Sequence, residues 1–306
     1  MNAPVDFKAM EGMFEREYKQ IEVRFDPEEA VAWTYMKPSG APCFSFGMLE
    51  ELRAHEGTIE ANGGRLLYEG ELRQIHYIII ASKIESIFSL GGNLAWIVPL
   101  IKSHDRDTLM RYAKLCIDNI YSRICNYHSP MTTISLVQGE ALGGGFETAL
   151  ASNVIIAERR SRMGLPEFLF NLFPGMGAYS LLGRRVGIKR AEEMIFSGRI
   201  YTAAELHEMG VVDVLAEDGL GEAAVDDYIC RNGRRRNAMQ AMFSCRQHLN
   251  PISYDELLNI TNIWVDAALR LEDRDLKLMS RLGRSQLKRF QAESSVQTMQ
   301  EQVAYA

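Results

Sequence analysis

Short, almost fully apolar runs constrain the fold of this chain more than any other sequence feature. Ile75 to Ser82 reads IHYIIIAS, and Thr132 to Val137 reads TTISLV. Runs of this length and composition are typical of strands buried on both faces, although a buried helix segment can show the same pattern. Each run is followed by a glycine-rich turn and then by a helical pattern. Strands that alternate with helices predict an α/β domain with a largely parallel sheet.

The rest of the chain fits the same interpretation. Alternating apolar residues predict a strand pair within Ile21 to Met36, turned at Asp26–Pro27. The other predicted elements are helices at Phe44 to Ala61 and Asp107 to Tyr127, a short helix through Ala151, and strands at Val154 to Ala157 and near Val211 to Leu215. From Ser180 onward the pattern is mostly helical apart from that last strand. We therefore expect one α/β domain followed by a helical C-terminal region.

Charge and hydropathy exclude several classes of protein. The 306 residues carry 40 acidic and 34 basic side chains, whereas nucleic-acid-binding proteins usually have a basic excess. The longest uncharged apolar run, Leu94 to Ile101, is far shorter than the roughly 20 residues that span a bilayer. The N-terminal stretch alternates charge and lacks the apolar core of a signal peptide. We expect neither a nucleic-acid partner nor a membrane association.

The cysteines and histidines indicate neither a metal nor a cofactor. Five scattered cysteines form no C-x-x-C pair, and six histidines show no ligand spacing. The pattern Gly175-Met176-Gly177 lacks the third glycine of a dinucleotide fingerprint. An odd, scattered set of cysteines suits a reducing compartment, so we expect a cytoplasmic protein.

Three consecutive glycines, Gly143 to Gly145, lie between an apolar strand and the start of a helix. Glycine lets the backbone approach a ligand and point an N–H group at it, and a helix N-terminus adds a partial positive charge. Together these features suit an oxyanion pocket. A tight turn without a ligand is the alternative interpretation. Phe88 to Asn93 (FSLGGN) is a second such loop, with a plain strand–helix turn as its alternative.

Two glutamates are candidates for proton transfer. Glu147 lies in the first turn of the helix that the three glycines open, and Glu167 follows Pro166 with apolar neighbours on its C-terminal side. Burial would raise the pKa of such a carboxyl group toward neutral pH, which suits general acid–base work. If the two groups lie within a few ångström, they share a proton and titrate as a pair. Taken singly, each is also explained as a helix stabiliser or an exposed loop acid.

The motifs in combination carry a resemblance to a known family. Phe88 to Asn93 (FSLGGN), Gly139 to Glu147 (GEALGGGFE) and Gly164 to Gly177 (GLPEFLFNLFPGMG) resemble the crotonase, or enoyl-CoA hydratase/isomerase, superfamily over roughly residues 20 to 250. Tyr35 to Pro38 (YMKP) and the unbroken block after Gly164 are similar to a narrower branch, the diffusible-signal-factor synthases. Members of this branch make cis-2-unsaturated fatty-acid signals in bacteria.

The resemblance implies both the fold and the main site residues. The fold would be a crotonase-type spiral of β-β-α units, as in ClpP and crotonase. Residues 1–215 would form the core, and residues 216–306 a helical region for oligomerisation and active-site cover. Gly92 and Gly144 would supply the oxyanion N–H groups, and Glu147 and Glu167 would be the catalytic pair. One departure is that Gly92 to Ala95 lacks the charge pair of many coenzyme-A hydratases, which weakens an assignment to fatty-acid degradation.

The implied reaction has two steps. The enzyme would dehydrate a medium-chain 3-hydroxyacyl thioester of acyl carrier protein and then hydrolyse it to the free cis-2-unsaturated acid used in quorum sensing. Glu167 would take the C2 proton and Glu147 would protonate the leaving hydroxyl, and the exchanged assignment stays open. The alternatives are an enoyl-CoA hydratase of fatty-acid degradation and a regulatory protein of the same fold that docks to a sensor kinase.

Substrate and partner contacts complete the expectations. The acyl chain needs an apolar pocket, and ordinary core packing is the alternative interpretation of the residues proposed for it. The basic run Arg231 to Arg236 could dock an acidic acyl carrier protein, and a solvated helix face is its alternative. The resemblance also implies a homo-oligomer, a trimer or a hexamer. The candidate substrate-binding residues are Gly91, Trp96, Leu142, Gly143, Met163, Leu169, Phe170 and Met176.

Overall fold

The computed structural model describes residues 13–304, with side chains for residues 13–291. Its centre is a six-stranded sheet in the order β1-β2-β5-β7-β9-β12. The strands are β1 (Ile21–Asp26), β2 (Val31–Met36), β5 (Tyr77–Ser82), β7 (Thr132–Val137), β9 (Val154–Glu158) and β12 (Val214–Ala216). Strand β1 is antiparallel to β2, and all other neighbours are parallel. The predicted strand pair and the largely parallel sheet are confirmed.

A smaller sheet carries the glycine-rich loops. Its order is β11 (Ile200–Thr202), β10 (Arg162–Gly164), β8 (Glu140–Leu142) and β6 (Ile87–Ser89), and β10, β8 and β6 run parallel. Because the carboxyl ends of parallel strands meet at one edge of a sheet, the segments that follow these three strands leave from the same edge. A separate hairpin consists of β3 (Arg65–Tyr68) and β4 (Glu71–Gln74).

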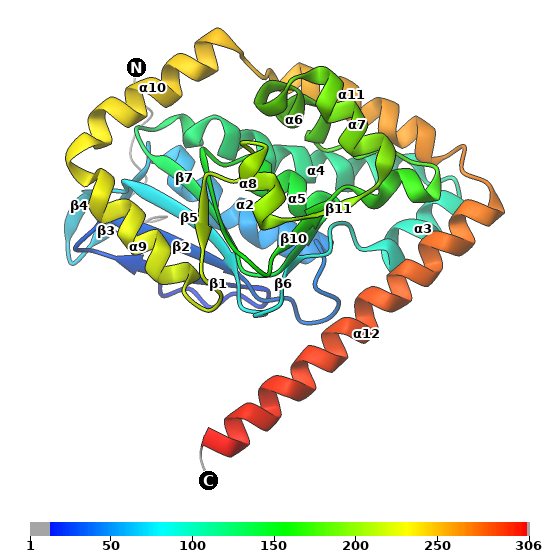
Figure 1. The fold of residues 1–306 in the computed structure, drawn as a ribbon, viewed down its shortest axis with the longest axis horizontal. Coiled ribbons are helices and arrows are strands. Elements are labelled where there is room, and N and C mark those ends of the chain that lie inside the picture. The colour runs from blue at the N-terminus through cyan, green and yellow to red at the C-terminus, as the bar shows by residue number, and fades with distance from the viewer. Residues whose placement is uncertain (1–12, 305–306) are drawn as a thin grey trace.

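Helices surround the two sheets (Figure 1). Those before the last strand are α2 (Phe46–Ala61), α3 (Leu94–Lys102), α4 (Arg106–Ile124), η1 (Asn126–His128), α5 (Gly144–Leu150), η2 (Pro166–Phe170), α6 (Ala178–Val186), α7 (Ile188–Ser197) and α8 (Ala203–Glu208). Those after it are α9 (Gly221–Asn232), η3 (Gly233–Arg235), α10 (Arg236–Leu249), α11 (Tyr254–Ala268) and α12 (Asp273–Ala304). The expected helical C-terminal region therefore begins at α9. The division into 1–215 and 216–306 stays a prediction, and it falls inside β12.

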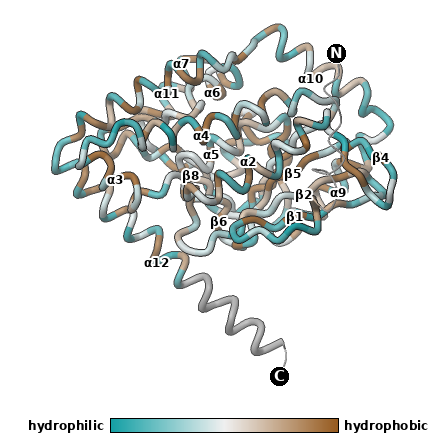
Figure 2. The backbone as a smooth tube through the Cα atoms, turned by 180° about the vertical axis from the view of Figure 1, so that it is seen from behind, coloured by the Kyte–Doolittle hydropathy of each residue, from teal (hydrophilic) through white to brown (hydrophobic). Residues whose placement is uncertain are grey.

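The main sheet is buried on both faces, as its apolar runs require. In β5, Ile80 packs with residues of α2 and α4, whereas Ile79 on the opposite face packs with residues of α9 and α10. Side chains alternate across a strand, so a run such as YIIIAS supplies both faces at once. Figure 2 shows hydrophobic residues along interior strands such as β5 and along α3.

The last two helices return to the middle of the chain. Helix α11 packs on α4, and α12 packs on α3. Figure 1 shows α12 running past α3 along the edge of the body and continuing beyond it toward the C-terminus. Among the described helices, none has both the length and the hydropathy needed to cross a bilayer.

Candidate active site

A cavity lies where the glycine loops meet α2, α4 and the C-terminal helices. Its empty space is about 880 Å³, a volume that includes the open mouth. Both predicted glutamates and both predicted oxyanion glycines line it. The lining residues are Phe44, Leu49, Leu52, Glu56, Ile80, Gly92, Leu94, Ile97, Tyr112, Cys116, Asn119, Ile120, Arg123, Gly144, Glu147, Thr148, Glu167, Phe170, Leu172, Gly175, Met176, Trp264 and Met279.

Glu147 is held in the first turn of α5 by two backbone donors. Its side chain is buried, and Oε1 accepts hydrogen bonds from the N–H groups of Met176 (2.8 Å) and Ala178 (3.0 Å). The helix can start here because Gly145 has no side chain: a Cβ at that position would lie 2.3 Å from the carbonyl oxygen of Ser89. The glycine run thus brings α5 against β6 and places Glu147 in the cavity.

Glu167 lies on the short helix η2, directly across from the glycine loop. A Cβ built on Gly143 would lie 2.4 Å from Oε1 of Glu167, and Gly143 has a φ of +52°. Only glycine meets both conditions without strain. The other oxygen, Oε2, is buried and has no hydrogen-bond partner among the described residues. Glu167 therefore presents one uncommitted carboxyl oxygen to the cavity.

Burial makes these two carboxyl groups titrate abnormally. Burial raises the pKa of Glu147, and the backbone hydrogen bonds from Ala178 and Met176 oppose the rise. Burial also raises the pKa of Glu167, and the nearby Glu147 charge raises it further. Because Glu147 has two N–H donors that stabilise its charged form, we place the negative charge on Glu147 and the shared proton on Glu167.

The two glycine loops bring two backbone N–H groups together. A Cβ on Gly91 would lie 3.0 Å from the nitrogen of Gly144, and a Cβ on Gly144 would lie 3.7 Å from the nitrogen of Gly92. Gly144 is the first residue of α5, where N–H groups have no partner within the helix. In the described part of the chain, no backbone hydrogen bond uses the N–H of Gly92 or of Gly144. Both N–H groups can therefore bind an oxygen in the cavity.

The cavity extends from this polar centre along α4. Tyr112, Cys116, Ile120 and Arg123 form a stripe at helical spacing, about 16 Å from first to last. Aliphatic residues of α2 face this stripe, and the far end is polar because Arg123 forms a buried ion pair with Glu56 (3.4 Å). A channel with apolar walls and a charged end suits an alkyl chain of limited length.

The structure divides the predicted substrate-binding residues into two groups. Phe170 and Met176 line the cavity, and Gly91 and Gly143 support its two glycine loops. The remaining four do not line it. Met163 is fully buried in the core, Leu169 is 62% exposed, Leu142 packs in a separate cluster near β6, and Trp96 contacts Phe46 and Tyr112.

Helical periodicity explains why Leu169 lies outside the cavity while Phe170 lines it. In η2 the chain advances by about three residues per turn, so the neighbours Leu169 and Phe170 point in different directions. A sequence window that shows only consecutive apolar residues cannot separate them. The cavity residues that the sequence analysis did not propose lie on α2, β5, α3, α4, α5, α11 and α12, just before α2 and just after η2. The stripe on α4 could have been found from its spacing, but Trp264 and Met279 lie more than 90 residues beyond Glu167 and share no local signal with it.

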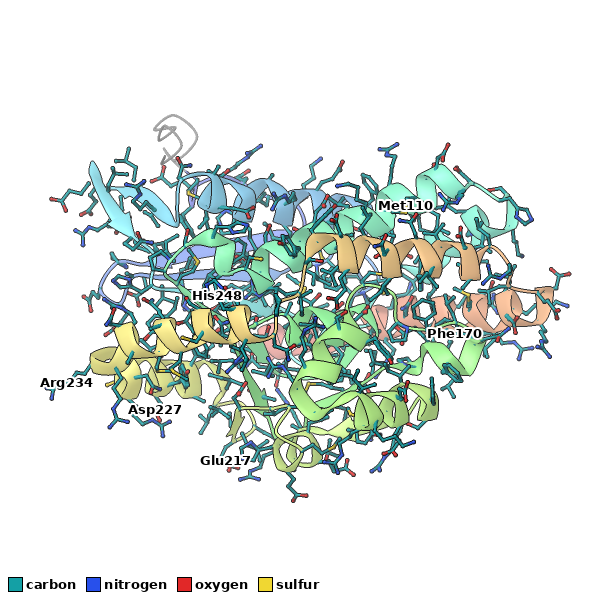
Figure 3. All side chains as sticks on the ribbon, turned by 90° about the horizontal axis from the view of Figure 1, so that it is seen from above. Met110, Phe170, Glu217, Asp227, Arg234 and His248 are labelled. Atoms are coloured by element: carbon teal, nitrogen blue, oxygen red, sulfur yellow. The ribbon has the colours of Figure 1, made fainter. Side chains whose placement is uncertain are left out.

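The basic run Arg231 to Arg236 is remote from this cavity. Figure 3 places Arg234 at one end of the molecule and Phe170, which lines the cavity, toward the other. Docking of an acyl carrier protein to this run stays a prediction. Among the described residues, no group of three or more His, Cys, Asp or Glu side chains could hold a metal ion.

Comparisons with known proteins agree with this architecture. The family model described as enoyl-CoA hydratase/isomerase matches residues 67–244. A mitochondrial methylglutaconyl-CoA hydratase of Mus musculus is 33% identical over 153 residues, which are 50% of this chain and 46% of that protein. The mitochondrial enoyl-CoA hydratase domain-containing protein 2 of Homo sapiens is 32% identical over 155 residues, 50% of this chain and 51% of that protein. The chain spans about half the length of these curated relatives.

Solved structures share the fold. The crystal structure of an enoyl-CoA hydratase from Bacillus anthracis has a TM-score of 0.65 and 22% sequence identity, and covers 84% of this chain and 93% of its own. At this identity the likeness concerns the fold alone. The expected α/β fold of crotonase type, with its helical C-terminal region, is confirmed.

Proposed function

The chain belongs to the enoyl-CoA hydratase/isomerase family, and on that premise we propose that it interconverts 3-hydroxyacyl and 2-enoyl thioesters. The observation that carries this proposal is the placement of two carboxyl groups, buried Glu147 and half-buried Glu167, in one cavity with the N–H groups of Gly92 and Gly144. Elimination of water next to a thioester needs one base, one acid and a binding site for the developing oxyanion. The cavity supplies all three.

The proposed elimination uses the groups as follows. The N–H groups of Gly92 and Gly144 bind the thioester oxygen and stabilise the negative charge that grows there. Glu167 takes the proton from C2, the C2–C3 double bond forms, and the C3–O bond breaks. Glu147 protonates the departing hydroxyl, which leaves as water. Elimination starts with Glu167 ionised and Glu147 protonated, the reverse of the distribution that the two backbone donors to Glu147 favour. It ends with Glu167 protonated and Glu147 ionised, which is the favoured distribution.

We further propose that the same site then hydrolyses the 2-enoyl thioester. Ionised Glu147 takes a proton from water as that water attacks the carbonyl carbon, and Glu167 returns its proton to the departing thiolate. The products are the free 2-unsaturated acid and a thiol, and both glutamates return to the state that starts elimination. The protons therefore balance over the two steps without another group. This cycle would make the chain a diffusible-signal-factor synthase that acts on acyl groups of acyl carrier protein and yields the cis acid.

Product analysis tests both levels of the proposal. Purified protein is incubated with 3-hydroxydodecanoyl acyl carrier protein, and the products are separated against standards and identified by mass spectrometry. Free cis-2-dodecenoic acid is the expected product. If the enoyl group instead stays on its carrier, the proposed elimination is supported and the proposed hydrolysis is refuted.

A coenzyme-A hydratase is the second candidate, because the curated relatives are named as such. The same groups would then work in reverse, with ionised Glu147 activating water and Glu167 protonating C2. Turnover with the coenzyme-A ester alone, and no release of free acid, would favour this second candidate. Binding of a sensor kinase is a separate proposal, which a pull-down with a variant lacking both glutamates would test apart from catalysis.

A further inference from the structure

Helix α12 lies directly against the first glycine loop. A Cβ on Gly283 would lie 3.1 Å from the nitrogen of Ala95 and 3.3 Å from Cβ of Leu94, so the helix approaches the start of α3 closely. One turn further along, Gln286 is buried with 8% of its surface exposed. Its side chain is therefore placed beside the loop that carries Gly92, more than 190 residues earlier in the sequence.

Gln286 donates two hydrogen bonds to this loop. Its Nε2 donates to the carbonyl oxygens of Leu90 (3.0 Å) and Gly92 (3.2 Å). An amide NH₂ group has two donors, and both are used here. These two carbonyls lie on either side of the peptide bond between Gly91 and Gly92, which carries the N–H of Gly92.

Three consecutive peptide planes are thereby held. The plane between Leu90 and Gly91 is fixed at its oxygen by Gln286 and at its N–H by Ser89 Oγ (3.2 Å). The plane between Gly91 and Gly92 is held through its oxygen, which accepts a hydrogen bond from the N–H of Phe44 (2.8 Å). The plane between Gly92 and Asn93 is held at its oxygen by Gln286, and its N–H lies against the Tyr112 hydroxyl and in the parallel bridge to Phe44.

Holding these planes matters because glycine would otherwise leave them free. Each peptide unit is rigid, so the direction of the Gly92 N–H depends only on the dihedral angles at Gly91 and Gly92. Gly91 has a φ of +82°, and glycine adopts both signs of φ readily. A loop of two glycines that is fixed on one side only would sample other orientations of that N–H.

We propose that Gln286 is a positioning residue of the oxyanion site, which fixes the Gly92 N–H before substrate binds. This inference rests on the proposed role of Gly92. Preorganised donors stabilise a developing charge without reorganisation during the reaction. Gln286 contributes that preorganisation from the C-terminal helix, through the backbone of the loop and without contact to the substrate.

The test replaces Gln286 by Met, which keeps length and flexibility and removes both donors. Losing an oxyanion donor outright costs about 100- to 1000-fold in kcat, so a misoriented one is expected to cost on the order of tenfold. KM should change by less than about twofold, because the loss is specific to the transition state. Ser285→Ala, an exposed position on the same turn, is the matched control and should behave as the native chain does.

A spectroscopic readout separates positioning from a general loss of structure. An enoyl amide analogue, labelled with carbon-13 at its carbonyl, is bound to each protein, and its C=O stretch is measured by difference infrared spectroscopy. The native protein and Ser285→Ala should lower the stretching frequency, and Gln286→Met should return it toward the value of the free analogue. Gln286→Glu keeps the shape without the two N–H donors and should give the same result if the Met variant is poorly folded.

Two results would overturn the inference. One is a folded Gln286→Met protein with native kcat. The other is a lower kcat with an unchanged carbonyl frequency, which would make Gln286 a structural residue only. If the native protein itself neither turns over an enoyl thioester nor shifts the carbonyl band, the proposed function fails instead.

Discussion

At the scale of single residues, the two glutamates differ in what surrounds them. Glu147 has two backbone donors, whereas Oε2 of Glu167 has no partner among the described residues. The sequence indicated both carboxyl groups and their pairing. It could not indicate this asymmetry, because the donors Met176 and Ala178 follow Glu147 by about thirty residues and contribute only backbone atoms.

Replacing either glutamate by glutamine should abolish most of the activity. We expect Glu147→Gln and Glu167→Gln each to lower kcat by about 100- to 10,000-fold, since each removes one proton-transfer group. The double variant should lose less than the product of the two single losses, because the two groups act as a unit. Steady-state kinetics with a 3-hydroxyacyl thioester measures this. Glu193→Gln, on the surface of α7, is the control, and native activity in either site variant would refute the mechanism.

The raised pKa values also predict how stability depends on pH. Burial raises the pKa of Glu167, so the folded chain keeps this proton at pH values where the unfolded chain, with a pKa of about 4.3, has lost it. Stability associated with this group is therefore full below that pKa and falls as the pH rises toward the folded pKa.

Glu167→Gln should consequently stabilise the protein near pH 8 and not near pH 4. One pKa unit corresponds to about 1.4 kcal/mol, so a gain of at least that order is expected at the higher pH. Denaturant unfolding at both pH values measures the difference. An equal change in the free energy of unfolding at pH 4 and pH 8 would contradict a buried, protonated Glu167.

At the scale of elements, the long segments were predictable and the three-residue strands of the smaller sheet were not. Strand β7 has its predicted bounds, and α2 begins two residues after its predicted start because Ser45 caps it through the N–H of Met48 (3.1 Å). Strands β6, β8 and β10 are too short to show a period of two. Hydrophobic periodicity therefore could not predict the smaller sheet, which aligns the two glycine loops with Glu167.

The loop between β8 and α5 offers a test of close packing. In Gly143→Ala, the new Cβ would displace the carboxyl group of Glu167, so we expect kcat to fall by at least about 100-fold, as for loss of that group. Gly70→Ala is the matched control, because Gly70 also has a positive φ (+79°) but has open space where the Cβ would lie. Both variants should lose about 1–3 kcal/mol of stability, because alanine is strained at a positive φ. Only the first should lose activity, and equal kinetic losses would point to strain instead of displacement.

At the scale of the whole molecule, the cavity is built from both ends of the described chain. Helices α2 and α4 supply its apolar walls, while Trp264 of α11 and Met279 of α12 close it from the C-terminal region. The fold class followed from the alternation of strands and helices. The contribution of the last two helices did not, since amphipathic helices carry no sequence signal for the surface that they will cover.

This construction predicts a defined dependence on acyl chain length. Each buried methylene contributes about 0.8 kcal/mol, so kcat/KM should rise about fourfold per added carbon while the chain fills the channel along α4. It should stop rising once the chain reaches the ion pair between Arg123 and Glu56, because burying alkyl groups against paired charges brings no gain. A series of 3-hydroxyacyl thioesters of increasing length measures this profile. A rate independent of length would mean that the acyl chain lies elsewhere.

The contacts of α12 link catalysis to the local unfolding of one helix. Asp275 accepts a hydrogen bond from Asn171 (3.1 Å) just after the turn of Glu167, and Gln286 holds the loop of Gly92. A ligand that binds only the assembled site must therefore stabilise the docked helix, and by reciprocity a docked helix must strengthen ligand binding. Hydrogen exchange of the α12 amides should slow in proportion to the occupancy of the cavity, while exchange in the distant hairpin β3–β4 should not change. The docking equilibrium of α12 would therefore report the occupancy of the cavity.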